Sequence, residues 1–104
     1  MTNRDIAPIY STLATDPDFA ELVTEYVSEI PDRVICCVEF VKTQNWPELK
    51  RFAHQIKGSA ASYGFEQITV IAGLLEAALG RDTELEQKLK MAEDLIANLS
   101  AIRS

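Results

Sequence analysis

The chain has 104 residues, of which 47% are hydrophobic and 25% charged, so it fits one domain with a single modest core and is neither disordered nor fibrous. No run of about 20 apolar residues is present, which excludes a membrane-spanning helix, and the first residues lack the pattern of a secretory signal. The net charge of −6 argues against a general nucleic-acid-binding protein. Cys36 and Cys37 are neighbours, and a disulfide between them would be strained. We therefore expect two reduced cysteines in or near the core of a cytoplasmic protein.

The chain begins with a weakly patterned stretch, residues 1–15, which we expect to form a short helix over one end of the domain. Its apolar side would consist of Ile6, Ile9, Tyr10 and Leu13.

A strong helical pattern follows. Asp16 is suited to cap this helix, with Pro17 at the first helical position. Pro31 falls inside the pattern and either kinks one long helix or separates two shorter ones. Apolar residues recur at spacings of three and four, which places them on one stripe: Phe19, Val23, Tyr26, Ile30, Val34, Cys37 and Val41.

The next helix follows a break at residues 43–47. Asn45, with Glu48 three residues later, resembles a capping box, and Pro47 fits the first turn. Gly64 is suited to the left-handed conformation that ends a helix. The buried stripe would consist of Leu49, Phe52, Ala53, Ile56, Ala60 and Tyr63.

Two more amphipathic segments complete the chain. Gly80 ends the first of them, and Thr83 with Glu86 forms a second capping-box pattern before the last helix. Their apolar stripes are Phe65, Ile68, Ile71, Ala72, Leu75 and Leu79, and then Leu85, Leu89, Ala92, Ile96 and Leu99.

These elements predict an all-α fold, because no segment alternates like a strand and the connections are short. The expected architecture is an antiparallel up-down-up-down four-helix bundle with a short N-terminal helical extension. Residues 1–104 would form one domain, with the extension at 1–15 and the bundle at 16–102. The initial Met1 and a last helix that runs nearly to Ser104 favour a free-standing protein.

His54 is the only histidine, and it lies in a basic segment of an otherwise acidic chain. Residues 42–57 hold four basic side chains and one acidic one, a local charge of +3. With 100° per residue, His54 lies about 140° from Leu49 on the core stripe, so its ring is expected to face solvent or a partner.

Gly58 and Lys57 stand beside His54 on the same helix. A glycine inside a helix costs about 1 kcal/mol relative to alanine, and here it leaves the imidazole accessible. Lys57 supplies a cation near an anion placed on the ring. A neutral imidazole is a good nucleophile, so the three residues together fit a phosphoryl acceptor. The alternatives are an ordinary exposed histidine and a glycine that permits close helix packing.

The segment AHQIKGSAASYGF, residues 53–65, resembles the signature of histidine-containing phosphotransfer (HPt) domains, H-x-x-K-G-S/G-A-x-x-x-G. The resemblance extends to Leu75–Glu76 and to the turn Asn45–Trp46, and it covers about residues 16–102. The matching signature positions are His54, Lys57, Gly58, Ser59, Ala60 and Gly64.

The resemblance implies a role for each matching residue. His54 would accept a phosphoryl group from an aspartyl phosphate on a receiver domain, of a response regulator or hybrid histidine kinase, and pass it to another receiver. Lys57 would neutralise phosphoryl oxygens, and Gly58 would admit the receiver's loops. Glu76 would hydrogen-bond the other ring nitrogen, or else be a plain surface carboxylate. Ser59 is expected to be structural. The partner-binding residues would be Lys50, Arg51, Lys57 and Ala61.

No cofactor or metal is expected in this chain, because Mg²⁺ and its acidic ligands would belong to the receiver. The chain has no glycine-rich phosphate loop, and Gln55 follows His54 where sensor-kinase helices have Glu, so we expect a carrier rather than an ATP-dependent kinase. We expect a monomer that binds neither nucleic acid nor membrane. The alternative function is a scaffold of the HPt type that docks receivers or dimerises without being phosphorylated.

Several apolar residues fall outside the core stripes. They are either covered by the N-terminal extension or form a docking patch beside His54. These residues are Ile35, Cys36, Phe40, Val70 and Leu74.

Overall fold

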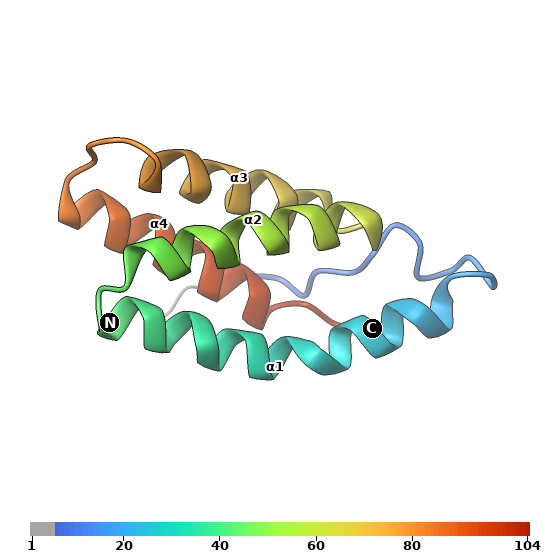
Figure 1. The fold of residues 1–104 in the computed structure, drawn as a ribbon. Coiled ribbons are helices and arrows are strands. Elements are labelled where there is room, and N and C mark those ends of the chain that lie inside the picture. The colour runs from blue at the N-terminus through green and yellow to red at the C-terminus, as the bar shows by residue number, and fades with distance from the viewer. Residues whose placement is uncertain (1–5) are drawn as a thin grey trace.

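Four helices make up the fold of residues 6–104, the part of the chain that the computed structural model describes (Figure 1). They are α1 (Ala20–Lys42), α2 (Trp46–Ser62), α3 (Glu66–Leu79) and α4 (Leu85–Ser100). Short connections join successive helices, which run antiparallel around one core. The predicted all-α four-helix bundle is therefore confirmed. The first five residues of the predicted extension lie outside the described residues.

Each helix contributes one apolar stripe to the core. α2 makes its most extensive contact with α3, while α1 contacts α2 and α4. At one end of the core the rings of Tyr26 and Tyr63 stack with their centroids 4.4 Å apart. Cys37 is buried, Cys36 is exposed, and both are free thiols. The largest fully buried side chains are Phe65, Leu49, Ile56, Ile68, Leu75, Leu95, Leu99, Val23 and Cys37. Removing such side chains from water stabilises the fold by about 1.5–3 kcal/mol each.

α1 is one continuous helix that contains Pro31, so of the two alternatives the single helix is observed. It curves along its length in Figure 1, as expected where proline removes a hydrogen-bond donor. The predicted start is wrong, because α1 begins at Ala20 and has no side-chain cap. Asp16 instead closes a preceding turn, where its Oδ1 accepts the Asp18 N–H at 2.9 Å and its carbonyl accepts the Ala20 N–H at 2.8 Å.

The structure at both ends of α2 largely agrees with the prediction from the sequence. The Asn45 side chain accepts the Glu48 N–H at 3.4 Å, but the Glu48 carboxylate bonds Arg51 instead of completing the capping box. At the other end Gly64 has φ of 82°, the left-handed conformation that the sequence predicts. The Phe65 N–H then reaches back to the Ala60 carbonyl at 2.8 Å, which satisfies a carbonyl at the helix end.

α4 begins differently from the prediction. Thr83 does not cap it, because the Thr83 hydroxyl donates to the Ala78 carbonyl at the end of α3, at 2.7 Å. The N-cap residue is Glu84, without a side-chain cap bond.

The predicted N-terminal helix is also wrong for the described part of residues 1–15, since residues 6–19 form turns and an isolated bridge. The Ile9 N–H donates to the Ala101 carbonyl at 2.8 Å, and the Arg103 N–H donates to the Ile9 carbonyl at 2.9 Å. The Ser11 hydroxyl donates to the Tyr63 carbonyl. Hydrogen bonds to distant segments thus replace those of a local helix. No helix within residues 6–104 has the length and apolar character that a membrane crossing requires.

Candidate functional site

His54 lies in the middle of α2 with its side chain 66% exposed. Helical geometry fixes this orientation, because the core residues of α2 turn to the opposite side of the helix. These core residues are Leu49, Phe52, Ala53, Ile56 and Ala60, each at most 6% exposed. The ring thus lies in the middle of a regular helix and is open to a second molecule.

Glu76 on α3 orients the ring. Its Oε2 lies 2.8 Å from His54 Nδ1. An ionised carboxylate only accepts hydrogen bonds, so Nδ1 carries the proton and Nε2 keeps a free lone pair. The free lone pair therefore lies on the ring nitrogen that does not contact Glu76.

Lys57 completes this group from α2. Its Nζ lies 2.7 Å from Glu76 Oε1, so one carboxylate bridges the imidazole and the ammonium group. The Lys57 hydrogen bond is the largest cause that lowers the pKa of Glu76 below its usual value. Burial, the next largest, opposes it, and the His54 hydrogen bond and the charges of Lys57 and His54 lower it further. Glu76 is accordingly ionised at neutral pH, as its role as a double acceptor requires.

Gly58 stands one turn from His54, and an added Cβ at this position would meet no atom within 4 Å. Close packing between helices therefore does not explain this glycine, which removes one of the alternatives that the sequence left open. The helix gives up about 1 kcal/mol of intrinsic stability here without an internal reason. The gap beside the ring is open to another molecule.

Gly73 is a residue of the site that sequence reasoning missed. It lies one turn before Glu76 on α3, and a Cβ at this position would come 3.3 Å from Lys57 Cδ. The glycine makes room for the lysine stem to cross α3 on its way to the carboxylate. The sequence places Gly73 three residues before Glu76, on the same side of the helix, and this spacing could have drawn attention to it. The contact with Lys57 could not be predicted, because it depends on how α2 and α3 pack.

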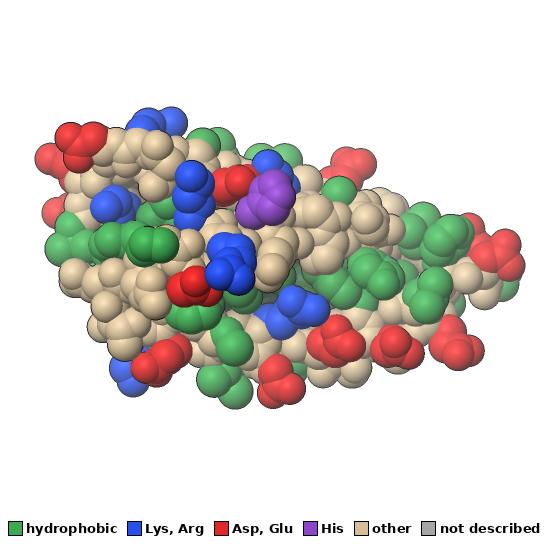
Figure 2. Space-filling view, in the orientation of Figure 1, with side chains coloured by type: hydrophobic (Ala, Val, Ile, Leu, Met, Phe, Trp, Pro, Cys, Tyr) green, Lys and Arg blue, Asp and Glu red, His purple; other side chains and the backbone are tan. Residues whose placement is uncertain are grey.

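The other predicted site residues lie on the exposed side of α2. Lys50 and Ala61 are exposed, and Arg51 pairs with Glu48 with 3.2 Å between Nη2 and Oε2. Figure 2 shows basic side chains beside the histidine on this face. Ser59 points elsewhere, with its hydroxyl 2.8 Å from the Tyr26 hydroxyl, so its predicted structural place agrees with the observed contact.

The apolar residues outside the core stripes are not covered by the described part of the extension. Ile35, Val70 and Leu74 are all more than half exposed. Phe40 is half-buried and packs edge-on against Phe52, with ring centroids 6.4 Å apart. Within residues 6–104, no group of three or more His, Cys, Asp or Glu side chains is placed to hold a metal ion.

The chain was compared with known protein families, curated proteins and solved structures. A family model described as "Hpt domain" matches residues 21–104, which include all four helices except the first residue of α1. No curated protein and no solved structure matches the chain.

Proposed function

The chain belongs to the Hpt domain family, a family of phosphorelay carriers without ATP sites, and from this premise we propose that His54 is its phosphoryl acceptor. His54 would take the phosphoryl group from an aspartyl phosphate on one receiver domain and deliver it to an aspartate on another. The observation that carries the proposal is the ring itself, held at Nδ1 by Glu76 with Nε2 exposed beside the gap at Gly58.

The proposed transfer needs few groups from this chain. The Nε2 lone pair attacks phosphorus, and the bond from phosphorus to the aspartate oxygen breaks as the N–P bond forms. The aspartate leaves as a free carboxylate, and the return step reverses these bond changes on a second receiver. The phosphorylated ring keeps its proton on Nδ1, where Glu76 balances its positive charge. Mg²⁺ bound by the receiver would supply further charge stabilisation on the partner's side.

Lys57 would stabilise the phosphoryl oxygens as they arrive. Its side chain is 40% exposed and one turn from the ring, so a small side-chain movement would bring the ammonium group to the transferred group. We further propose that residues 1–104 act as one monomeric domain in the cytoplasm, where reduced thiols such as Cys36 and Cys37 are usual.

The test is incubation of the chain with a panel of receiver domains carrying labelled aspartyl phosphate. The expected result is label on this chain that is lost in acid and stable in base, as for a phosphoramidate. His54→Gln should abolish labelling while the melting curve stays unchanged, because the side chain makes no core contact. A phosphate-free chain that still binds receivers would instead indicate the scaffold function, and label that survives in His54→Gln would place the acceptor elsewhere.

A further inference from the structure

Lys57 lies against one side of α3 along its whole length. The Thr69 hydroxyl donates to the Lys57 carbonyl at 3.3 Å, and a Cβ added at Gly73 would come 3.3 Å from Lys57 Cδ. Farther along α3, Glu76 Oε1 lies 2.7 Å from Lys57 Nζ. Residues 69, 73 and 76 are four and three positions apart, so they share one side of the helix. The backbone, the stem and the ammonium group of one lysine therefore each meet a different residue of α3.

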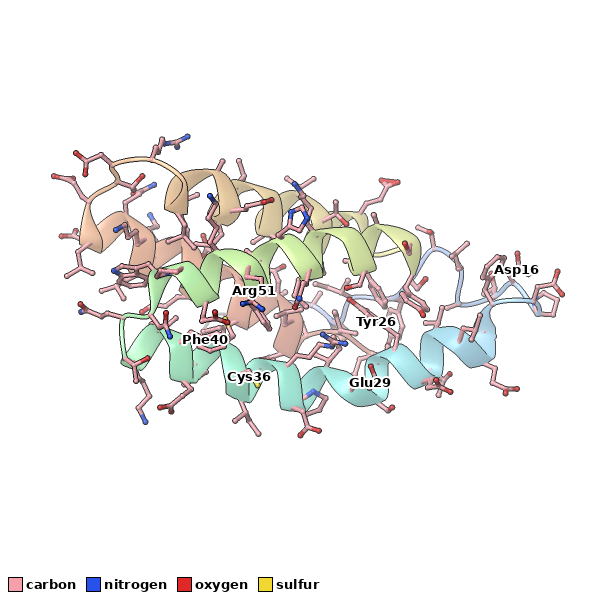
Figure 3. The ribbon with its side chains drawn as sticks, in the orientation of Figure 1. Asp16, Tyr26, Glu29, Cys36, Phe40 and Arg51 are labelled. Atoms are coloured by element: carbon pink, nitrogen blue, oxygen red, sulfur yellow. The ribbon has the colours of Figure 1, made fainter. Side chains whose placement is uncertain are left out.

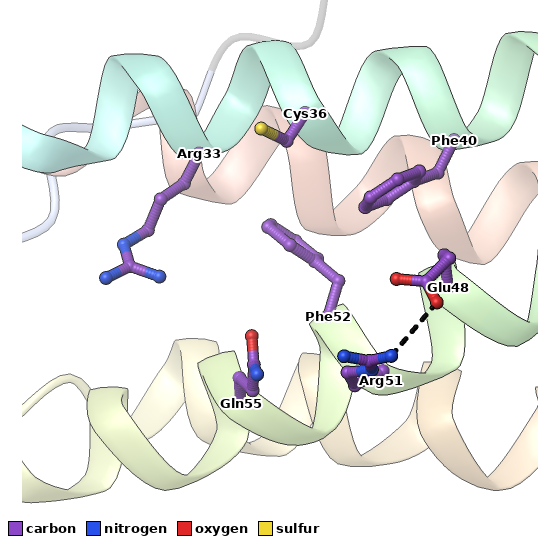
Figure 4. Close-up of a pocket in the computed structure, with 7 residues that line it drawn as sticks. All are labelled: Arg33, Cys36, Phe40, Glu48, Arg51, Phe52 and Gln55. Carbon is purple, nitrogen blue, oxygen red and sulfur yellow. Dashed lines mark hydrogen bonds and ion pairs between the residues drawn. The ribbon is translucent and has the colours of Figure 1, made fainter.

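The opposite side of α2 is built differently. A cleft of about 220 Å³ lies there between α2 and α1, and its lining includes Cys36 and Phe40 of α1 and Arg51 of α2 (Figure 3 and Figure 4). Arg51 bonds Glu48, another residue of this cleft, at 3.2 Å. The charged residues of α2 thus pair with each other on the α1 side, whereas α3 supplies the partner of Lys57.

Gly73 keeps the path of the lysine stem open. A separation of 3.3 Å is shorter than an ordinary contact between two carbon atoms, about 3.5–4.0 Å, so an alanine here would push the stem aside. A β-branched residue would widen the obstruction, because it carries two further heavy atoms on Cβ. Unlike the space at Gly58, the space at Gly73 is occupied from within the chain. The bare backbone at this position therefore permits the ion pair between Lys57 and Glu76.

We propose that Gly73 is a positioning residue that sets how strongly Lys57 holds a phosphoryl group on His54. This inference rests on the proposed function, because it concerns the same transfer. While the stem lies over Gly73, the ammonium group rests on Glu76, and it turns from this carboxylate to serve the phosphoryl oxygens. A contact that weakens when the group arrives opposes its arrival and favours its departure. Gly73 thus shifts the transfer equilibrium away from phosphorylated His54.

The first measurement needs no receiver domain. The carboxyl carbon of Glu76 is titrated by NMR in wild type, Gly73→Ala and Gly73→Val. Since the Lys57 hydrogen bond is the largest cause of the lowered pKa of Glu76, this pKa should rise toward its ordinary value of 4.5 in Gly73→Val, with Gly73→Ala between. Lys57→Ala gives the value without the ion pair. An unchanged titration in Gly73→Val would mean that the stem reaches Glu76 by another route, and would overturn the proposal.

The second measurement is the equilibrium ratio of phosphorylated His54 to phosphorylated receiver. The phosphoryl group moves in this equilibrium between the receiver's aspartate oxygen and His54 Nε2. Gly73→Val should raise the ratio about threefold, the size expected for the loss of one partly exposed ion pair that competes with loading. Lys57→Ala should lower the ratio instead, because the cation itself is lost.

A double-mutant cycle separates positioning from a merely structural effect. In the Lys57→Ala background, Gly73→Val should leave the ratio unchanged, because the stem that the new side chain would meet is gone. Ala77→Val is the matched control, since it places the same β-branched side chain at an exposed position one turn farther along α3 and should have no effect. Circular dichroism verifies that each variant keeps the bundle, and Gly73→Ala carries the same cycle with a smaller shift if Gly73→Val does not fold.

The outcomes distinguish this inference from the proposed function. A ratio that falls in Gly73→Val, or a change that persists in the Lys57→Ala background, would mean that the added side chain obstructs the receiver. Either result overturns the role of Gly73 and leaves His54 as the acceptor. Failure of every receiver to label His54 would overturn the proposed function, and this inference with it, whatever the titration of Glu76 gives.

Discussion

Gly58 and Gly64 lie six residues apart near the end of the same helix, and they serve opposite needs. Gly64 has a positive φ, and a Cβ there would come within 2.6 Å of Ser11 Oγ and 2.9 Å of Thr12 Oγ1. Gly58 has right-handed helical geometry and open space around it. The fold therefore requires Gly64, whereas nothing in the described fold requires Gly58. The comparison separates the part of the motif that builds the bundle from the part that is available to a partner.

Substitution of Gly58 tests the second half of this comparison and, with His54 in place, should have the largest effect on transfer. Gly58→Ala should raise the free energy of unfolding by about 1 kcal/mol, because alanine is the better helix former. Gly58→Leu should slow transfer from the receiver by about a hundredfold, since its side chain displaces the reacting atoms from the ring. Urea denaturation and the labelling rate measure the two effects. Wild-type transfer by Gly58→Leu would show that the gap is not used.

Substitution of Gly64 tests whether the fold requires a glycine at this position. Gly64→Ala should lower the free energy of unfolding by about 2–3 kcal/mol, because it adds left-handed strain and crowds the Ser11 and Thr12 hydroxyls. Transfer per folded molecule should stay close to wild type. Gly58→Ala is the matched control, with the same chemical change and the opposite sign. A stability loss below about 0.5 kcal/mol would mean that residues 11–13 move aside at little cost.

Lys57, like Gly58, lies in the part of the motif that is available to a partner, and its substitution should have a smaller effect on the transfer rate. Lys57→Ala should slow transfer about tenfold, because one cation near the phosphoryl oxygens is removed. Lys57→Arg should restore part of the rate, and Lys90→Ala, an exposed lysine on α4, should leave it unchanged. Rates at saturating receiver give the measurement. Equal rates in wild type and Lys57→Ala would exclude a role for this ammonium in transfer.

Glu76→Gln should give the smallest effect on stability, and that effect should depend on pH. The pKa of Glu76 is lower in the folded chain than its ordinary value of 4.5. The carboxylate therefore stabilises the folded state above about pH 4.5, and this contribution disappears as the pH falls through the lowered value. Denaturation curves of wild type and Glu76→Gln should differ at pH 7 and converge in acid. A difference that grows as the pH falls would contradict the assigned ion pairs.

The parts of the fold that the sequence predicts are those that depend on neighbours along the chain. Most of the apolar stripes, the exposed face of His54 and the left-handed Gly64 follow from helical periodicity and local backbone geometry. The stripes are wrong at their edges, because Phe19 and Leu85 are exposed and the buried Leu95 was not predicted. The contact between Glu76 and His54 came from the family resemblance, because α3 and α2 must first be packed to bring these residues together.

The wrong predictions share one physical cause, which is a partner far away in the sequence. Ile9 pairs with residues 101–103 instead of forming a local helix. Thr83 bonds the end of the preceding helix instead of capping the next one. The cleft between α1 and α2 was missed for the same reason, since Arg33 and Gln55 line one cleft only when α1 lies against α2. Periodicity cannot reveal such pairs, because it describes one helix at a time.

Glu76 pairs with both His54 and Lys57, and this sharing also affects how strongly a phosphoryl group on His54 would be stabilised. In the resting protein the ammonium of Lys57 already has an anion 2.7 Å away. An incoming phosphoryl group must compete for that ammonium, so only part of the Coulomb attraction is gained on loading. A phosphoryl group on His54 would therefore gain less from Lys57 than it would from an unpaired ammonium group. The weaker hold would make the group easier to pass on.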